Sequence, residues 1–335
     1  MFCPRQMRSV QHREAVSLRR TTLVIAVFTI LLLPSVAVGD KREGLPSHSI
    51  LHPACSYRET SSSSSSSENG IFHSVALPDD DLFRPLLADP KEPRFSGSFQ
   101  RVRFRDIDDS VNASAVGFGG TFGLWGLRHE RNCNGLQVNL FGAVFSQFNL
   151  DAPSSDLINS DFQFGLPVTF RHGPFSARLR IFHQSSHVGD EFLLNNPDFD
   201  RVNLSFEMVE AVISLHNRWG RLYGGGGYIY NRNPKFKQAV VKWGGELRGS
   251  PIGSPLLGRL MEGLHVAPVF GADINSVEEL DWKINMNFLG GLEWSRRSSN
   301  RRLRLLLGYY RGRNPYGQFF DQRIESYNIN LQIEL

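Results

Sequence analysis

The sequence predicts an all-β protein, a transmembrane antiparallel β-barrel of about 12 strands that follows a cleaved signal peptide and a disordered lead-in. Three observations predict this fold class. The chain begins with an export signal, apolar and polar residues alternate with period two over most of its length, and each alternating segment has about ten to fourteen residues. Strands of soluble sheets usually have about five or six residues, whereas a tilted strand needs about 9–11 to cross a bilayer.

Residues 1–39 have the three parts of a secretory signal. Arginines precede an apolar run from Leu23 to Leu33, and small residues follow it, with Ala37-Val38-Gly39 fitting a cleavage site. The apolar run is shorter than the roughly 20 residues of a membrane-spanning helix, which makes an uncleaved anchor the less favoured alternative. We therefore expect export, with cleavage after Gly39.

The net charge of +4 belongs to this signal. Residues 1–39 hold five arginines and one glutamate, and the other 296 residues hold 32 basic and 32 acidic residues. A balanced chain lacks the basic surface that binds nucleic acid, so we expect no nucleic-acid partner. The expected partners are membrane lipid and the barrel-assembly and export machinery. Of the three cysteines, Cys55 and Cys133 remain after cleavage and either form a disulfide or stay as free thiols.

Residues 40–92 predict a disordered lead-in that carries no apolar face. Ser61 to Ser67 is an unbroken serine run, and Pro85, Pro90 and Pro93 indicate an irregular approach to the folded part. The acidic residues Asp79 to Asp81 fit a solvated turn better than a calcium loop, because they lack the ligand pattern of such loops.

Residues 93–335 predict the barrel itself. Twelve segments alternate with period two, near residues 94–105, 114–127, 135–148, 160–171, 175–186, 202–215, 219–231, 238–249, 264–275, 282–294, 302–311 and 324–335. Their polar faces indicate a lumen that is water-filled or hydrogen-bonded, lined by Gln137, Asn139, Arg178, Arg180, Lys283 and Glu293. A secreted soluble β-sandwich is the alternative fold.

Aromatic residues near the segment ends also fit a membrane protein, because amphipathic rings prefer the bilayer interface. They are Trp125, Trp219, Tyr228, Tyr230, Trp243, Trp282, Trp294, Tyr309 and Tyr310.

Two segments carry a family resemblance. LFRPLLADPKEPRF at residues 82–95 and FSARLRIFHQSSH at residues 175–187 resemble the domain-of-unknown-function family 1207. The resemblance covers roughly residues 75–335 and implies a bacterial outer-membrane barrel, with a location in the cell outer membrane. It implies no activity.

One constellation in this chain could carry chemistry. Within residues 175–186, parity places His183 and Ser185 at the end of an outward row that begins with Phe175, Ala177, Leu179 and Ile181. An imidazole and a hydroxyl two residues apart on one strand face can act as general base and nucleophile.

This His-x-Ser arrangement is similar to the active strand of two outer-membrane lipid hydrolase families, the phospholipase A type and the lipid A deacylase type. That similarity implies a catalytic set of His183 as base, Ser185 as nucleophile and an acidic or amide side chain on the neighbouring strand. Glu207 and Glu210 are the candidates, and parity with Leu204, Phe206 and Met208 favours Glu210. A metal site at His183 and His187 is a weaker alternative that lacks a fixed third ligand, so no metal and no cofactor is expected.

Three functions stay open from the sequence. The first is an outer-membrane barrel of undetermined role, structural or a narrow passage, in which His183 and Ser185 are an ordinary polar rim. The second is an outer-membrane lipid acyl hydrolase with the His-x-Ser site, so the sequence leaves open whether the protein is an enzyme. The third is a secreted soluble β-sandwich that binds a partner.

Overall fold

The computed structural model describes residues 72–107, 109–129, 134–235, 237–252, 264–296 and 300–335. The predicted signal peptide, the serine run, Cys55 and Cys133 lie outside these residues. Strands dominate the described chain, which has one short α-helix and two 3-10 turns. None of its helices has the length and hydropathy needed to cross a membrane.

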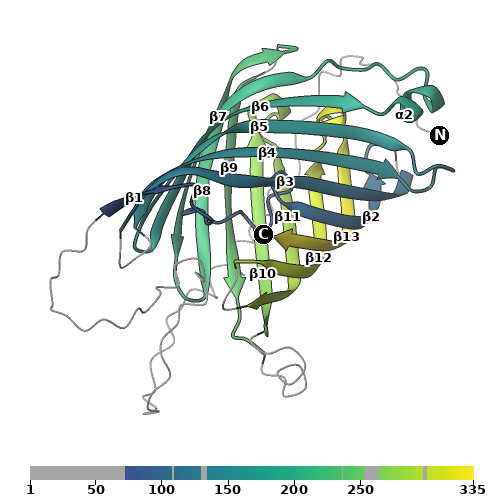
Figure 1. Cartoon of the computed structure of the whole chain (residues 1–335). Helices are drawn as coiled ribbons and strands as arrows, with labels where there is room; N and C mark the ends of the chain where they lie inside the picture. Colours follow the sequence, from purple (N-terminus) through teal and green to yellow (C-terminus); the bar gives the residue numbers. More distant parts are fainter. Residues whose placement is uncertain (1–71, 108, 130–133, 236, 253–263, 297–299) are drawn as a thin grey trace, which may run out of the picture. The chain divides into compact units, whose positions relative to one another are not determined.

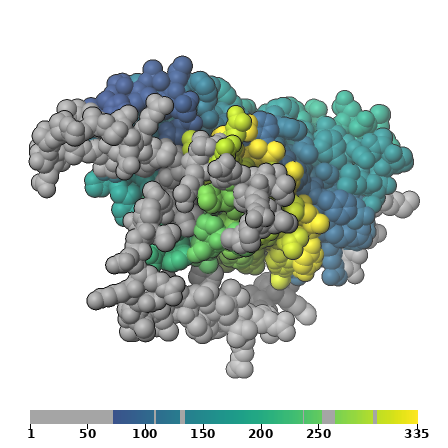
Figure 2. Space-filling view, turned by 60° about the horizontal axis from the view of Figure 1, so that its bottom comes forward, coloured from purple at the N-terminus to yellow at the C-terminus, as the bar shows by residue number. Residues whose placement is uncertain are grey.

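Twelve antiparallel strands, β2 to β13, close into one barrel (Figure 1). Each strand pairs with the next in the chain, and β13 pairs back onto β2 with Ile333 opposite Phe95. In Figure 2 the yellow C-terminal strands lie against the blue N-terminal ones at this closure. The predicted strand number and antiparallel barrel are confirmed, and the β-sandwich is wrong because one sheet closes on itself. The strands are β1 Phe72–Ala76, β2 Phe95–Phe104, β3 Asp109–His129, β4 Gly135–Asn149, β5 Leu157–His172, β6 Phe175–Val188, β7 Ser205–His216, β8 Gly220–Asn233, β9 Ala239–Arg248, β10 Leu264–Val277, β11 Ile284–Arg296, β12 Arg302–Arg313 and β13 Arg323–Glu334; the helices are α2 Asp190–Asn195, η2 Glu278–Leu280 and η3 Gly317–Phe319.

The two faces of the wall differ in chemistry. On β12, Leu303, Leu305 and Leu307 are exposed on the outside, while Arg302 and Arg304 are buried inside. An apolar outside and a fully hydrogen-bonded closed sheet are what a bilayer requires of a strand protein. Five of the six predicted lumen residues are buried there, namely Gln137, Asn139, Arg178, Arg180 and Glu293. The prediction that Lys283 lines the lumen is wrong, because this residue is exposed in the turn before β11. Tyr310 is also turned inward, away from the predicted interface.

The lead-in predicted for residues 40–92 is ordered from Phe72 onward. β1 pairs with the last part of β3, from Trp125 to His129, and β2 pairs with the first part of the same strand, from Asp109 to Gly117. Between them, residues 78–94 run through the barrel, and we call this segment the plug. Its apolar side chains are 0–3% exposed, namely Leu82, Phe83, Leu86, Leu87 and Ala88. The prediction of disorder is therefore wrong for residues 72–92, since their few apolar groups are buried by distant strands.

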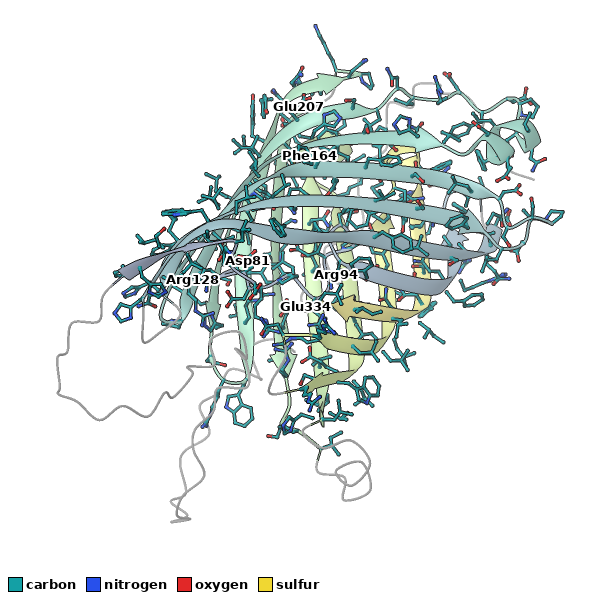
Figure 3. All side chains as sticks on the ribbon, in the orientation of Figure 1. Asp81, Arg94, Arg128, Phe164, Glu207 and Glu334 are labelled. Carbon is teal, nitrogen blue, oxygen red and sulfur yellow. The ribbon has the colours of Figure 1, made fainter. Side chains whose placement is uncertain are left out.

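Ion pairs from several wall strands hold the plug. Glu92 accepts two hydrogen bonds from the Arg178 guanidinium, the longer one at 3.0 Å. Asp89 pairs with Lys242 of β9 at 2.7 Å, and Lys91 pairs with Asp161 of β5 at 2.6 Å. Figure 3 shows two further plug residues, Asp81 and Arg94, within the barrel. The plug thus pairs with part of the lumen charge, while other wall residues pair with one another, as Arg248 and Arg304 do with Glu293.

The wall donates hydrogen bonds to the plug backbone as well. Arg221 donates to the carbonyl oxygens of Arg84 and Pro85 at 2.7 and 2.8 Å, and Asn287 donates to that of Ala88 at 2.6 Å. The Leu87 amide in turn donates to Glu246 at 2.7 Å. Buried backbone groups without helix or strand partners need such ligands, so the plug can be irregular and still stable.

We expect Glu92→Ala to destabilise the protein by about 3 kcal/mol, because it leaves the Arg178 charge buried with a single remaining acidic partner. That partner is Glu210, 3.5 Å away, which keeps the loss below the top of the range. The midpoint of urea unfolding in detergent micelles measures the effect. Asp106→Ala is the matched control, because its pair with Arg323 is exposed and contributes less than about 1 kcal/mol. Equal midpoints for the two variants would contradict the structural role of the plug.

A cap covers the end of the barrel at which β6 terminates. It consists of residues 189–204, which include α2, and of η3. Phe192, Phe199 and Phe319 pack edge-on or tilted with ring centroids 5.2–5.5 Å apart. Gln318 donates to the carbonyl oxygens of Ser186 and Val202 at 2.9 and 2.7 Å. These contacts fix the end of β6, where His183 and Ser185 lie.

Candidate active site on the outer wall

The predicted parity of β6 is confirmed. Leu179, Ile181, His183 and Ser185 face outward, and Arg178, Arg180, Gln184 and Ser186 are buried inside. The inward ion pairs explain why this register is fixed. Slipping β6 by one residue would move two arginines from their carboxylate partners to the apolar face.

A hydrogen bond joins His183 to the neighbouring strand. Register pairs His183 of β6 with Glu207 of β7, and the Nδ1–H group donates to the Glu207 carboxylate at 3.0 Å. An ionised carboxylate can only accept, which places the proton on Nδ1 and leaves the Nε2 lone pair available. The side chains are 44% and 29% exposed, so the pair is reachable from outside the wall.

Ser185 follows on the same face. Two residues along a strand span about 6.6 Å between Cα atoms, and Ser185 lies opposite Phe162 of β5 and Ser205 of β7. Among the contacts of the described chain, no hydrogen bond joins the His183 ring to the Ser185 hydroxyl. Catalytic contacts in free enzymes are commonly long and tighten when substrate binds.

The structure places Glu210 elsewhere. Its side chain is 3% exposed in the lumen, where it pairs with Arg180 at 2.7 Å and with Lys242 at 2.9 Å. The prediction that Glu210 shares the face of His183 is therefore wrong, and the other candidate, Glu207, has that place. The prediction took the apolar residues in alternation with Glu210 as the lipid-facing side of β7. Met208 and Val212 in fact point inward, on the same side as Glu210. Both pack in apolar clusters inside the barrel.

His187 continues the outward row, but within the described part of the chain no hydrogen bond or ion pair joins it to an acid. Its ring packs edge-on against the Phe162 ring, with the two ring centroids 5.6 Å apart. Within the described ranges, no three His, Cys, Asp or Glu side chains are grouped so as to hold a metal ion. The outward chemistry of β6 is therefore that of a base, its acidic partner and a hydroxyl.

A closed barrel with an apolar outer wall and a charged, plugged lumen defines a membrane-spanning β-barrel of the outer-membrane type. The chain belongs to the family described as "Protein of unknown function (DUF1207)", whose model matches residues 8–334. The resemblance carried by residues 82–95 and 175–187 is confirmed. No curated protein matches this chain significantly.

Several solved outer-membrane proteins are similar at low identity. Outer membrane phospholipase A from Escherichia coli is 12% identical with a TM-score of 0.47, over 75% of this chain and 93% of that one. The transport unit of the autotransporter AIDA-I from Escherichia coli is 13% identical with a TM-score of 0.39, over 76% and 94%. LpxR from Salmonella typhimurium is 12% identical with a TM-score of 0.36, over 72% and 100%. No function transfers at these values.

Proposed function

We propose that this protein is a serine hydrolase of the outer membrane that cleaves acyl ester bonds of membrane lipids. The observation that carries the proposal is the 3.0 Å hydrogen bond from His183 Nδ1 to Glu207, which lies on the outer wall beside Ser185. Nucleophile, base and orienting acid are the three roles that acyl transfer requires of side chains.

The reaction follows from the tautomer that Glu207 selects. Nε2 of His183 takes the proton of the Ser185 hydroxyl while Oγ attacks the ester carbonyl carbon. Collapse of the tetrahedral intermediate breaks the carbonyl–oxygen bond of the ester, and the imidazolium returns the proton to the leaving alcohol. Water then attacks the acyl-serine with the same base, releasing a fatty acid and restoring Ser185. Glu207 stabilises the imidazolium in both halves.

The position of the site selects the substrate class. On β6, His183 and Ser185 follow the exposed side chains of Leu179 and Ile181, so the outer face of this strand changes from apolar to polar at the site. A lipid in the surrounding bilayer has its ester groups at the boundary between hydrocarbon and headgroups. It can therefore reach this site without entering the barrel.

The plugged lumen disfavours the alternative role as a narrow passage. Residues 78–94 occupy the interior and are held there by the ion pairs of Asp89, Lys91 and Glu92. A function on the outside of the wall needs no opening. We also propose that the protein resides in the cell outer membrane. Extraction by detergent with a heat-modifiable gel shift would support that location, and release by a salt wash would refute it.

The hydrolase is tested with purified protein in mixed micelles of labelled phospholipid or lipid A. We expect release of fatty acid, and a serine-directed fluorophosphonate should form one adduct on the peptide that carries Ser185. Ser205→Ala is the matched control, because it removes an outward hydroxyl one strand away and should leave the adduct in place. No fatty acid from either lipid, together with no adduct at Ser185, would refute the proposed function.

A further inference from the structure

A row of outward positions crosses the wall at the level of His183. From β3 to β7, register aligns Gly120, Gly142, Phe164, His183 and Glu207 in that order. Figure 3 labels Phe164 and Glu207, which lie on the strands either side of β6. Because the two glycines have no side chain, the outer surface of the barrel is recessed on the β3–β4 side of His183.

A groove occupies this lower part of the wall. It has a volume of about 400 Å³ and is lined by Phe118, Gly142, Val144, Phe162 and Phe164, with His183 at one end. Gln163 also lines the groove, but its side chain is turned into the lumen, where its amide donates to Gln184 at 2.7 Å. Phe162 and Phe164, two residues apart on β5, border the groove where it reaches the imidazole, and Phe162 lies opposite Ser185.

We propose that this groove binds one acyl chain of the substrate lipid, with the ester group held at His183 and Ser185. The inference rests on the proposed function and names the part of the substrate that the wall recognises. Neighbouring strands lie about 4.8 Å apart, so the distance from β6 to β3 is about 14 Å. With carbon–carbon bonds of about 1.5 Å in a zigzag, this length accommodates an extended chain of roughly 10–12 carbons.

The packing of the wall does not require glycine at these two positions. A Cβ atom at Gly120 would meet no atom within 4 Å, and one at Gly142 would meet only the Gln163 carbonyl oxygen at 3.9 Å. At the adjacent Gly119, by contrast, a Cβ would lie 2.5 Å from that of Ala143. Gly119 is thus required for packing, whereas Gly120 and Gly142 leave open space that a ligand can fill.

The experiment fills the groove and varies the acyl chain. Gly142→Leu should lower kcat/KM for 16-carbon esters about 10- to 100-fold, the range that a lost apolar pocket for a few methylenes gives. Gly142 lies two strands from β6, about 10 Å away, so esters of four carbons end before they reach it and should change less than about twofold. Gly224→Leu is the matched control. Gly224 lies on β8 opposite Ile213 of β7 and does not line the groove, and the nearest neighbour of its Cβ is also 3.9 Å away, the Lys242 carbonyl oxygen of β9.

Failure of this inference differs from failure of the proposed function. Equal loss for short and long chains, or no loss for either, overturns the groove while leaving the hydrolase intact. If the wild type cleaves no ester of any length, the function fails, and the groove is then judged by binding. A 16-carbon diazirine fatty acid should photolabel residues 118–122 and 142–144 in Ser185→Ala protein, and Gly142→Leu should abolish that labelling. Labelling spread evenly over the outer wall would overturn the groove.

Discussion

Ser185→Ala should lower kcat for lipid ester hydrolysis by roughly 10⁴- to 10⁶-fold, the loss that follows removal of a serine nucleophile. Without the hydroxyl no acyl-enzyme forms, and water has to attack the ester directly. KM should change little, because the substrate would still contact the apolar wall around Phe162 and Phe164. Fatty-acid release from labelled phospholipid in mixed micelles measures the effect.

The control for this variant is Ser205→Ala, which lies opposite Ser185 on β7 and should keep wild-type activity. Before activity is compared, each variant is run unheated and heated on a denaturing gel. A shift between the two samples shows that the variant forms the closed barrel. Equal fatty-acid release by wild type and Ser185→Ala would exclude Ser185 as the nucleophile.

Glu207→Gln should lower kcat about 10³- to 10⁴-fold, although it changes one atom of the side chain. The amide can donate as well as accept, so it permits the tautomer that has its proton on Nε2, and that tautomer cannot accept the serine proton. It also removes the negative charge that stabilises the imidazolium. Steady-state kinetics on a soluble short-chain ester separate kcat from KM.

Asp198→Asn makes the same chemical change at an exposed acid in the cap and should leave kcat unchanged. A Glu207→Gln enzyme with wild-type kcat would mean that Glu207 neither orients nor stabilises His183. Glu210→Gln is unsuitable as a control, because Glu210 pairs with Arg180 and Lys242 inside the barrel.

Much of the barrel is predictable because its signal is local. Alternation in segments such as residues 302–311 records which side chains face lipid, and it places nearly every strand end within a few residues. The same parity placed His183 and Ser185 outward correctly. The order of the strands in the barrel is also predictable, because each strand pairs with the strands before and after it in the chain.

The plug and the orienting acid were beyond this kind of reasoning because both depend on distant contacts. Residues 78–94 have too few apolar groups to fold alone, and only β6, β9 and other strands supply their partners. The plug also brings Phe83 into the lumen, where Val212 of β7 packs with it. Apolar residues therefore occur on both faces of β7, and parity alone could not separate Glu207 from Glu210.

The attachment of β1 and β2 to one strand restrains the plug at both of its ends. The chain leaves β3 at one point and returns to it at another, so the plug is a loop whose two ends are tied to the same strand. β2 also pairs with β13, where Phe104 lies opposite Ile324, 220 residues later in the chain. Both ends of the plug are therefore anchored in the sheet, and the β2 end is held by two strands. The plug cannot leave the lumen unless the pairing of β1 or of β2 with the wall is broken first.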